Sequence, residues 1–94
     1  MPANESVRQV KVRNKLGLHA RPASLFVQTA SRFDSEIVVT REGGSEPADG
    51  KSLMSMLILT ACCGTPLTIT GTGKDAEAAV NALAELVDRG FVED

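Results

Sequence analysis

His19 is the one histidine in the chain, and Arg21 lies two residues after it. Both belong to the stretch Leu16-Gly17-Leu18-His19-Ala20-Arg21-Pro22-Ala23-Ser24. Neutral imidazole is a competent nucleophile near physiological pH, and a guanidinium is a planar cation with several donors for oxyanions. These two residue types at this spacing therefore fit a site that carries an anionic group, such as a phosphoryl group, on the histidine ring.

A helix is expected to begin beside His19. Proline is accepted in the first turn of a helix, which suits Pro22, and Gly17 permits a sharp turn just before it. Apolar residues then recur at three- and four-residue steps, the spacing of one buried helical face: Ala23, Phe26, Val27, Ala30 and Phe33. His19 should therefore lie at the positive end of a helix, beside backbone N–H groups that bind anions.

Two other interpretations of His19 stay open from the residues alone. The ring could be a partly exposed helix cap without chemistry. It could also be a general base, which would need an orienting carboxylate brought near it by folding, with Asp49 and Glu85 as candidates. The stretch itself has no carboxylate and no second histidine, so we expect no metal site there.

Two motifs resemble those of the HPr family, the small phosphocarrier proteins of the bacterial phosphoenolpyruvate-dependent phosphotransferase system. The segment Leu18–Ser24 resembles the family's active-site signature. The segment Gly50-Lys51-Ser52-Leu53-Met54-Ser55-Met56 matches a second motif at the expected distance downstream. The resemblance runs from about Val7 to Leu86, nearly the whole chain.

The resemblance implies a phosphoryl relay. His19 would receive a phosphoryl group on Nδ1 from Enzyme I, which phosphoenolpyruvate charges, and would pass it to a histidine of an enzyme IIA-class protein. Ala20 and Arg21 would stabilise the phosphoryl group. The protein would then be a phosphohistidine-bearing intermediate of the cytoplasm and not an independent enzyme, and it would need no cofactor. We expect it to be a monomer.

The second helix is expected to bind partners. Its segment holds more apolar residues than one buried stripe needs: Leu53, Met54, Met56, Leu57, Ile58, Leu59 and Ala61. Either this helix is more deeply buried than most, or it exposes an apolar patch of the kind that marks an interaction surface. In the HPr family the positions matching Leu53, Met54 and Leu57 form such a patch, and Ala20, Arg21 and Ser24 complete the docking face. A regulatory protein-binding module that acts through this patch is the alternative function.

Ser52 has two predicted roles. As the N-cap of the second helix it would contribute ~1 kcal/mol. Its position also matches the serine that an ATP-dependent kinase, HPr kinase/phosphorylase, modifies in some family members. A phosphoserine there would be tolerated by the helix dipole and would add about two negative charges beside the apolar patch.

The first helix departs from a common family pattern. HPr proteins of sugar uptake commonly place further basic residues along its exposed side, where this chain has Gln28 and Ser31. Arg21 and Arg32 are the positive charges that remain there. Sugar transport and nitrogen regulation, whose carrier is called NPr, are therefore both open.

The pattern predicts one α+β domain over residues 1–94, with Met1–Ser6 frayed. Strands are expected around residues 10–13, 36–41, 46–49 and 66–70, with a hairpin turn at Gly43-Gly44-Ser45 and a break at Gly71-Thr72-Gly73. Helices are expected from His19 to about Arg32, from Ser52 to a stop at Gly64, and from Asp75 to Arg89-Gly90. The order β-α-β-β-α-β-α gives an open-faced β-sandwich, a four-stranded antiparallel sheet with three helices on one face. The resemblance implies the same fold.

Charge and composition exclude several classes of partner. A net charge of −2 does not point to nucleic acid or to an anionic membrane, and 3% aromatic residues argue against base stacking. No apolar run approaches the length of a membrane span. Cys62 and Cys63 are adjacent, which disfavours a disulfide between them, so we expect thiols that pack as small hydrophobes in a reducing compartment.

Overall fold

The computed structural model of the chain describes residues 4–15, 17–44, 46–59 and 62–91. Leu16, Ser45 and Ala61, named above, and the first three residues of the segment predicted to be frayed therefore lie outside the described residues. Four strands are present: β1 (Glu5–Lys11), β2 (Glu36–Arg41), β3 (Ala48–Asp49) and β4 (Pro66–Thr72). Three helices alternate with them: α1 (Ala20–Ala30), α2 (Leu53–Ile58) and α3 (Ala76–Asp88). The predicted order of elements is confirmed.

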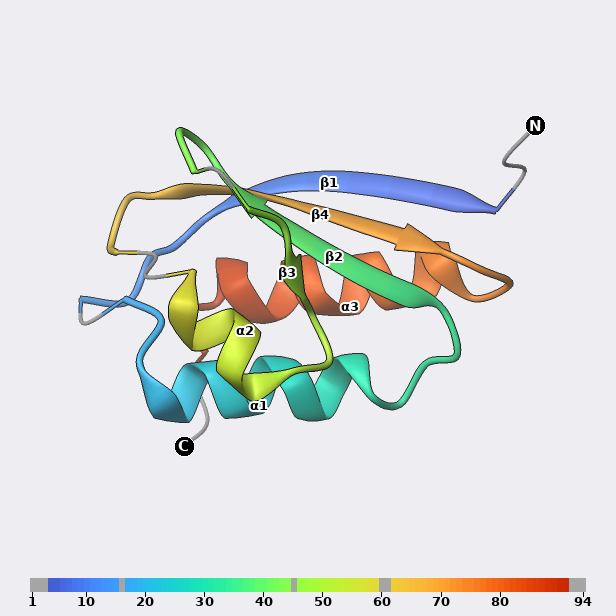
Figure 1. The fold of residues 1–94 in the computed structure, drawn as a ribbon, viewed down its shortest axis with the longest axis horizontal. Helices are drawn as coiled ribbons and strands as arrows, with labels where there is room; N and C mark the ends of the chain where they lie inside the picture. Colours follow the sequence, from blue (N-terminus) through green and yellow to red (C-terminus); the bar gives the residue numbers. More distant parts are fainter. Residues whose placement is uncertain (1–3, 16, 45, 60–61, 92–94) are drawn as a thin grey trace.

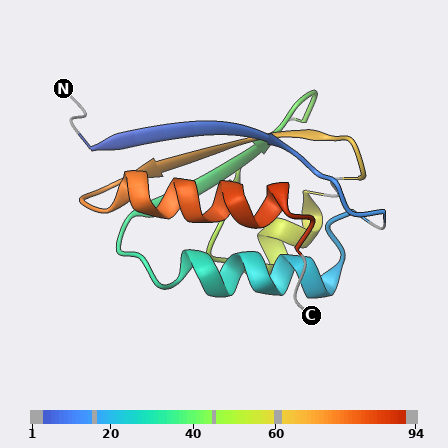
Figure 2. The same ribbon diagram turned by 180° about the vertical axis from the view of Figure 1, so that it is seen from behind.

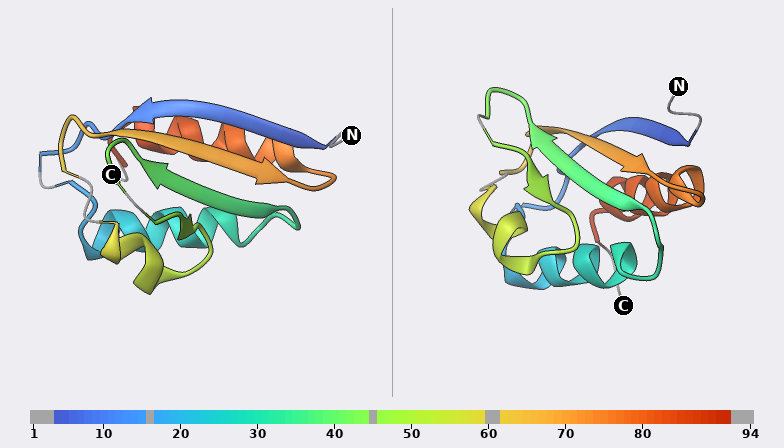
Figure 3. Two further views of the ribbon diagram at one scale, coloured as in Figure 1. Left: turned by 45° about the horizontal axis from the view of Figure 1, so that its top comes forward. Right: turned by 45° about the vertical axis from the view of Figure 1, so that its right-hand side comes forward.

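The four strands form one sheet in the order β1-β4-β2-β3, and each neighbouring pair is antiparallel. All three helices lie on the same side of this sheet (Figure 1). The view from behind shows α1 and α3 side by side beneath it (Figure 2). Turning the top forward brings the sheet in front of the helices (Figure 3). The predicted open-faced β-sandwich is therefore confirmed. In the part of the chain described, every helix is too short or too polar to cross a membrane.

The core lies between the sheet and the helices. Alternate strand residues point toward the helices and are buried: Val10, Ile37, Val39, Leu67 and Ile69, and Val12 just after β1 is buried with them. They meet one stripe from each helix: Ala23, Phe26 and Ala30 from α1, Met56 from α2, and Ala79, Val80, Leu83 and Val87 from α3. The period of two in the strands and of 3.6 in the helices thus brings the two apolar surfaces together. Of the predicted α1 stripe, Val27 and Phe33 are only half-buried, against the same core.

Several element boundaries differ from the prediction. β1 begins at Glu5, which pairs with Thr72, so the prediction of a frayed segment was wrong for residues 5 and 6. α1 ends at Ala30, not Arg32, because the amides of Arg32 and Phe33 bond three residues back, in the tighter pattern that closes many helices. β3 is limited to two residues, Ala48 and Asp49, where four were predicted.

α2 and β4 also end elsewhere than predicted. α2 ends at Ile58, so Gly64 is not its stop; Gly64 instead takes a φ of 90° in the loop before β4. β4 continues through Gly71, which pairs with β1 and β2 where a break was predicted. A Cβ at Gly71 would lie 2.8 Å from Cγ2 of Val80. Glycine at this position allows the strand and α3 to approach closely.

Phe91 closes the end of α3. Its N–H donates to the Leu86 carbonyl at 3.0 Å, and the Gly90 N–H donates to the Val87 carbonyl at 2.9 Å. Gly90 has a φ of 69°, so the helix ends in a Schellman motif. Phe91 also has a positive φ, of 60°, and its side chain is buried in the core. The predicted end of this helix at Arg89-Gly90 is confirmed.

Asp75 links the start of α3 to the loop before β2 through hydrogen bonds. Its carboxylate accepts hydrogen bonds from the backbone N–H groups of Asp34 and Ser35, each at 2.9 Å, and from the Ser35 hydroxyl. Asp75 is the N-cap residue of α3, but its side chain caps no amide of that helix. The sequence places the acid at the helix start, whereas its partners come from a loop far away in the chain.

These bonds hold the pKa of Asp75 below its usual value of 3.8, chiefly through the Ser35 hydroxyl and then through the Asp34 amide. Because the folded pKa lies below the unfolded one, the carboxylate stabilises the fold above the unfolded pKa, and this contribution is lost as the pH falls through the folded pKa. We therefore expect Asp75→Asn to unfold at lower urea concentration than the native chain at pH 7.

The same variant should lose less stability than the native chain between about pH 5 and pH 2, since the titrating group is gone. Urea unfolding followed by circular dichroism at each pH measures both effects. Glu42→Gln, which removes an exposed carboxylate, is the control and should keep the native pH dependence. An acid slope in Asp75→Asn equal to that of the native chain would contradict the prediction.

Candidate functional site

His19 lies where the loop after β1 becomes α1. It is the N-cap residue, with a φ of −90° and a ψ of −170°, and its carbonyl accepts the Ala23 N–H at 3.0 Å. The predicted position at the start of the helix is confirmed. Its side chain makes no capping hydrogen bond, so the residue caps the helix through its backbone alone, and it is exposed, as expected for a partly exposed cap. The ring faces solvent, where another molecule can reach it.

The first turn of α1 presents hydrogen-bond donors beside this ring. The amides of Ala20 and Arg21 lie where a helix has no preceding turn of carbonyls, whereas Pro22 has no N–H to offer. The Arg21 residue is exposed on the same turn. No acidic residue lies in this turn to offset the positive end of the helix dipole. The arrangement is suited to an anion with several oxygens attached to the ring.

Asn14 and Gly17 fix the loop that leads into His19. The Asn14 side chain donates to the Gly17 carbonyl at 2.6 Å, and the His19 N–H donates to the same oxygen at 3.0 Å. Gly17 has a φ of 71°, which favours glycine. Asn14 was not predicted as part of the site. The signal that could have found it is the tendency of asparagine side chains to bond the backbone of the turn that follows.

The residues just before β4 pack against Val12 and Arg13, which follow β1 and begin the loop that leads to His19. The Gly64 N–H donates to the Val12 carbonyl at 2.7 Å, and the Val12 N–H donates to the Thr65 carbonyl at 3.0 Å. The Cys63 Sγ lies 3.6 Å from the Arg13 carbonyl oxygen. Both cysteines are exposed thiols, so the prediction that they pack as small hydrophobes was wrong.

The two carboxylates proposed as partners for His19 do not bond its ring in the described structure. Asp49 instead accepts the Lys51 backbone N–H at 3.0 Å through Oδ1, and Glu85 is exposed on α3. A histidine that acts as a general base needs such a group to orient it, so the geometry gives no support to that interpretation. The described ranges also contain no group of three His, Cys, Asp or Glu residues that could hold a metal ion.

α2 carries an exposed apolar surface, the α2 patch, formed by Leu53, Met54, Leu57 and Ile58. The exposed fractions are 41% for Leu53, 66% for Met54 and 71% for Ile58, and Leu57 is half-buried. Met56 is buried in the core, so α2 turns one side to the core and another to solvent. Ile58, the most exposed of the four, was missed. It lies four residues after Met54, on the same face of the helix.

The α2 patch and the start of α1 belong to one region of the molecule. α2 packs against α1 and lies over its N-terminal half (Figures 1 and 2). Ala20 is exposed there, and Ser24, half-buried, accepts a hydrogen bond from the Gln28 side chain at 3.2 Å. The fold therefore brings together on one side the positions that the sequence assigned to two separate motifs.

Ser52 is the N-cap of α2. Its hydroxyl oxygen accepts the Ser55 N–H at 3.2 Å, as predicted for a cap, and the residue is half-buried. The neighbouring Lys51 ammonium donates to the Phe33 carbonyl at 2.6 Å, just after α1. Ser52 thus lies at the junction of α1 and α2, next to Leu53 of the α2 patch.

Comparison with known proteins places this geometry among phosphocarriers. A family model described as the PTS HPr component phosphorylation site matches residues 6–89. The phosphocarrier protein HPr of Treponema pallidum is 41% identical over 88 residues, which cover 94% of this chain and 98% of that protein. The phosphocarrier protein NPr of Shewanella violacea is 43% identical over 86 residues, 92% of each chain. The crystal structure of HPr-C-His from Thermoanaerobacter tengcongensis superposes with a TM-score of 0.87 at 38% identity, over 95% of this chain and 98% of that one.

Proposed function

This chain belongs to the HPr family of phosphocarriers of the phosphotransferase system, and from that membership we propose that His19 is the residue that carries the phosphoryl group. The observation that supports the assignment is the exposed His19 ring at the N-cap of α1, followed by Ala20 and Arg21. Phospho-Enzyme I is the proposed donor, and a histidine of an enzyme IIA-class protein is the proposed acceptor. The proposed location is the cytoplasm, where these partners would meet a monomeric carrier.

In the proposed transfer, Nδ1 of His19 attacks the phosphorus of the donor, and the bond from phosphorus to the donor breaks as the new P–N bond forms. The Ala20 and Arg21 amides and the Arg21 guanidinium would hydrogen-bond the phosphoryl oxygens. These donors are few, so they would hold the phosphoryl group without binding it too tightly for transfer to the acceptor. The acceptor reverses the step at its own histidine, so the carrier returns unchanged and turns over no small molecule alone.

The relay is tested with purified Enzyme I and phosphoenolpyruvate, followed by phosphorus NMR. We expect an acid-labile phosphohistidine signal in the native chain and none in His19→Ala. Arg21→Met should slow the transfer roughly tenfold, since hydrogen bonds to charged groups contribute about 1.5–3 kcal/mol. Arg32→Met removes an exposed charge beyond the other end of α1 and serves as the control.

A native chain that binds Enzyme I but gains no phosphoryl group would contradict the relay. That outcome would instead favour the alternative, a regulatory binding module that acts through the α2 patch.

We also propose that partners dock on the α2 patch together with Ala20 and Ser24. Burying an exposed apolar side chain at an interface is favourable, and a few such residues carry most of the binding energy. Met54→Ala should therefore weaken Enzyme I binding by roughly fivefold or more, measured by calorimetry. Val7→Ala is the matched control, because Val7 is 53% exposed on β1 and lies outside the patch. Equal losses in the two variants would contradict this assignment.

Phosphorylation of Ser52 by a kinase of the HPr kinase/phosphorylase type is proposed as regulation. Ser52→Asp should keep the cap of α2, since aspartate caps helices well, but it should slow transfer from Enzyme I by placing a negative charge beside Leu53. Ser52→Ala should lower the free energy of unfolding by ~1 kcal/mol and leave transfer intact.

Gln9→Glu adds the same charge on β1 and is the control for net charge. If Ser52→Asp and Gln9→Glu transfer phosphoryl groups at the same rate, a charge at Ser52 does not regulate docking.

A further inference from the structure

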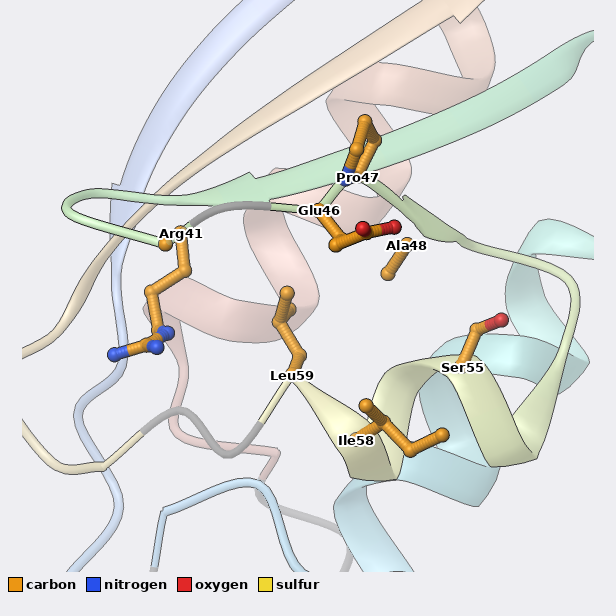
Figure 4. A pocket seen from close by; sticks show the side chains of 8 residues that line it. Arg41, Glu46, Pro47, Ala48, Ser55, Ile58 and Leu59 are labelled. Carbon is orange, nitrogen blue, oxygen red and sulfur yellow. The ribbon is translucent and has the colours of Figure 1, made fainter.

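A cavity of about 350 Å³ opens between α2 and the hairpin that joins β2 to β3 (Figure 4). Its walls include the apolar side chains of Pro47, Ala48, Ile58 and Leu59. A volume of this size falls in the range of small-molecule sites, which are mostly apolar with a few polar groups. The cavity lies away from His19 in the chain and uses none of the residues assigned to the relay, apart from Ile58 at the edge of the α2 patch.

Arg41 is the cationic residue in the lining of this cavity, which also includes Glu46 and Ser55. It is the last residue of β2, where the alternation that buries Ile37 and Val39 turns its side chain toward the helices. The Arg41 Nε is buried and makes no hydrogen bond to any described residue. A buried donor without an acceptor is costly, and a guanidinium is best satisfied by a carboxylate. The cavity wall thus contains a cationic donor that lacks an acceptor.

Glu46 lines the same cavity but does not satisfy Arg41. In Figure 4 the Glu46 carboxylate and the Arg41 guanidinium point to different sides of the space. No ion pair joins them within 4.0 Å in the described structure, and Glu46 is exposed, so water solvates its charge. The ligand chemistry is therefore set by the buried Arg41 donor, with Glu46 as a modest opposing charge.

We propose that this cavity binds a carboxylate attached to a branched apolar body. The carboxylate would lie on the Arg41 guanidinium, and the apolar body would lie against Ile58 and Leu59. Such a group could be a free organic acid, or an acidic side chain beside an apolar side chain on a protein docked on the neighbouring α2 patch. Neither source requires His19, so the inference stands apart from the proposed relay.

Isocaproate is a probe of this chemistry, and isocaproamide is its neutral counterpart of the same shape. In NMR titrations we expect isocaproate to shift the Arg41 Nε–H signal and the methyl signals of Ile58 and Leu59, and to leave the Val7 methyls on β1 unchanged. Isocaproamide should bind roughly tenfold more weakly, and Arg41→Met should abolish the preference for the acid. Equal binding of acid and amide, or no shift at Arg41, would overturn the proposal.

Glu46→Gln separates a carboxylate site from a site for a cation or a zwitterion. Removing this charge should tighten isocaproate binding by about twofold, because a nearby like charge is lost. Glu42→Gln, outside the cavity lining, should change binding less. Weaker binding in Glu46→Gln would overturn the proposal, since it would mean that Glu46 holds the ligand.

The source of the carboxylate is decided by phosphoryl transfer from Enzyme I in the absence of any added acid. Slower transfer to Arg41→Met than to the native chain would support a partner side chain as the occupant. Unchanged transfer, with the preference for isocaproate over isocaproamide lost in that variant, would support a free acid. Failure of this inference leaves phosphorylation of His19 intact, so the two proposals fail separately.

Discussion

The position of His19 depends on the hydrogen bonds that the Gly17 carbonyl oxygen accepts. This oxygen accepts hydrogen bonds from both the Asn14 side chain and the His19 N–H, so it links a residue just after β1 to the N-cap of α1. The helix that follows is held to the sheet by Phe26 and Ala23, which are fully buried. A ring attached to this fixed point can be exposed without being loosely placed. The proposed relay needs that combination, because its donor and its acceptor would both have to reach the same ring nitrogen in turn.

Features that depend on neighbouring residues in the chain could be predicted from the sequence. Features that depend on contacts between distant segments could not. His19 at a helix start and Ser52 as a cap follow from local rules about proline, serine and apolar spacing, and both are found. Gly71 has the sequence signature of a strand break, yet it lies within β4, at a position where α3 passes too close for a Cβ. The residues that bond Asp75 lie some forty positions earlier, which no local rule could reveal.

The balance of charge and apolar surface on the docking side has a physical consequence. Gln28, which is neutral, donates a hydrogen bond to Ser24 on the exposed side of α1. The exposed cations near this helix are Arg21 at its start and Arg32 just beyond its end. Charges across an interface chiefly raise the rate of encounter, whereas buried apolar contacts chiefly lengthen the life of the complex. A face with few cations and with Met54 and Ile58 largely exposed should therefore hold its partners more by contact than by attraction over distance.

The strand order β1-β4-β2-β3 also bears on synthesis. β1 leads directly into the loop before His19, but β1 pairs only with β4, near the other end of the chain. Pairings between such distant segments form late, because the intervening chain must first be closed into a loop. A nascent chain on the ribosome would already display the histidine while still lacking the strand that anchors its loop. Under the proposed relay, the site should therefore become competent only after β4 has emerged, so truncated chains would not compete for the proposed donor.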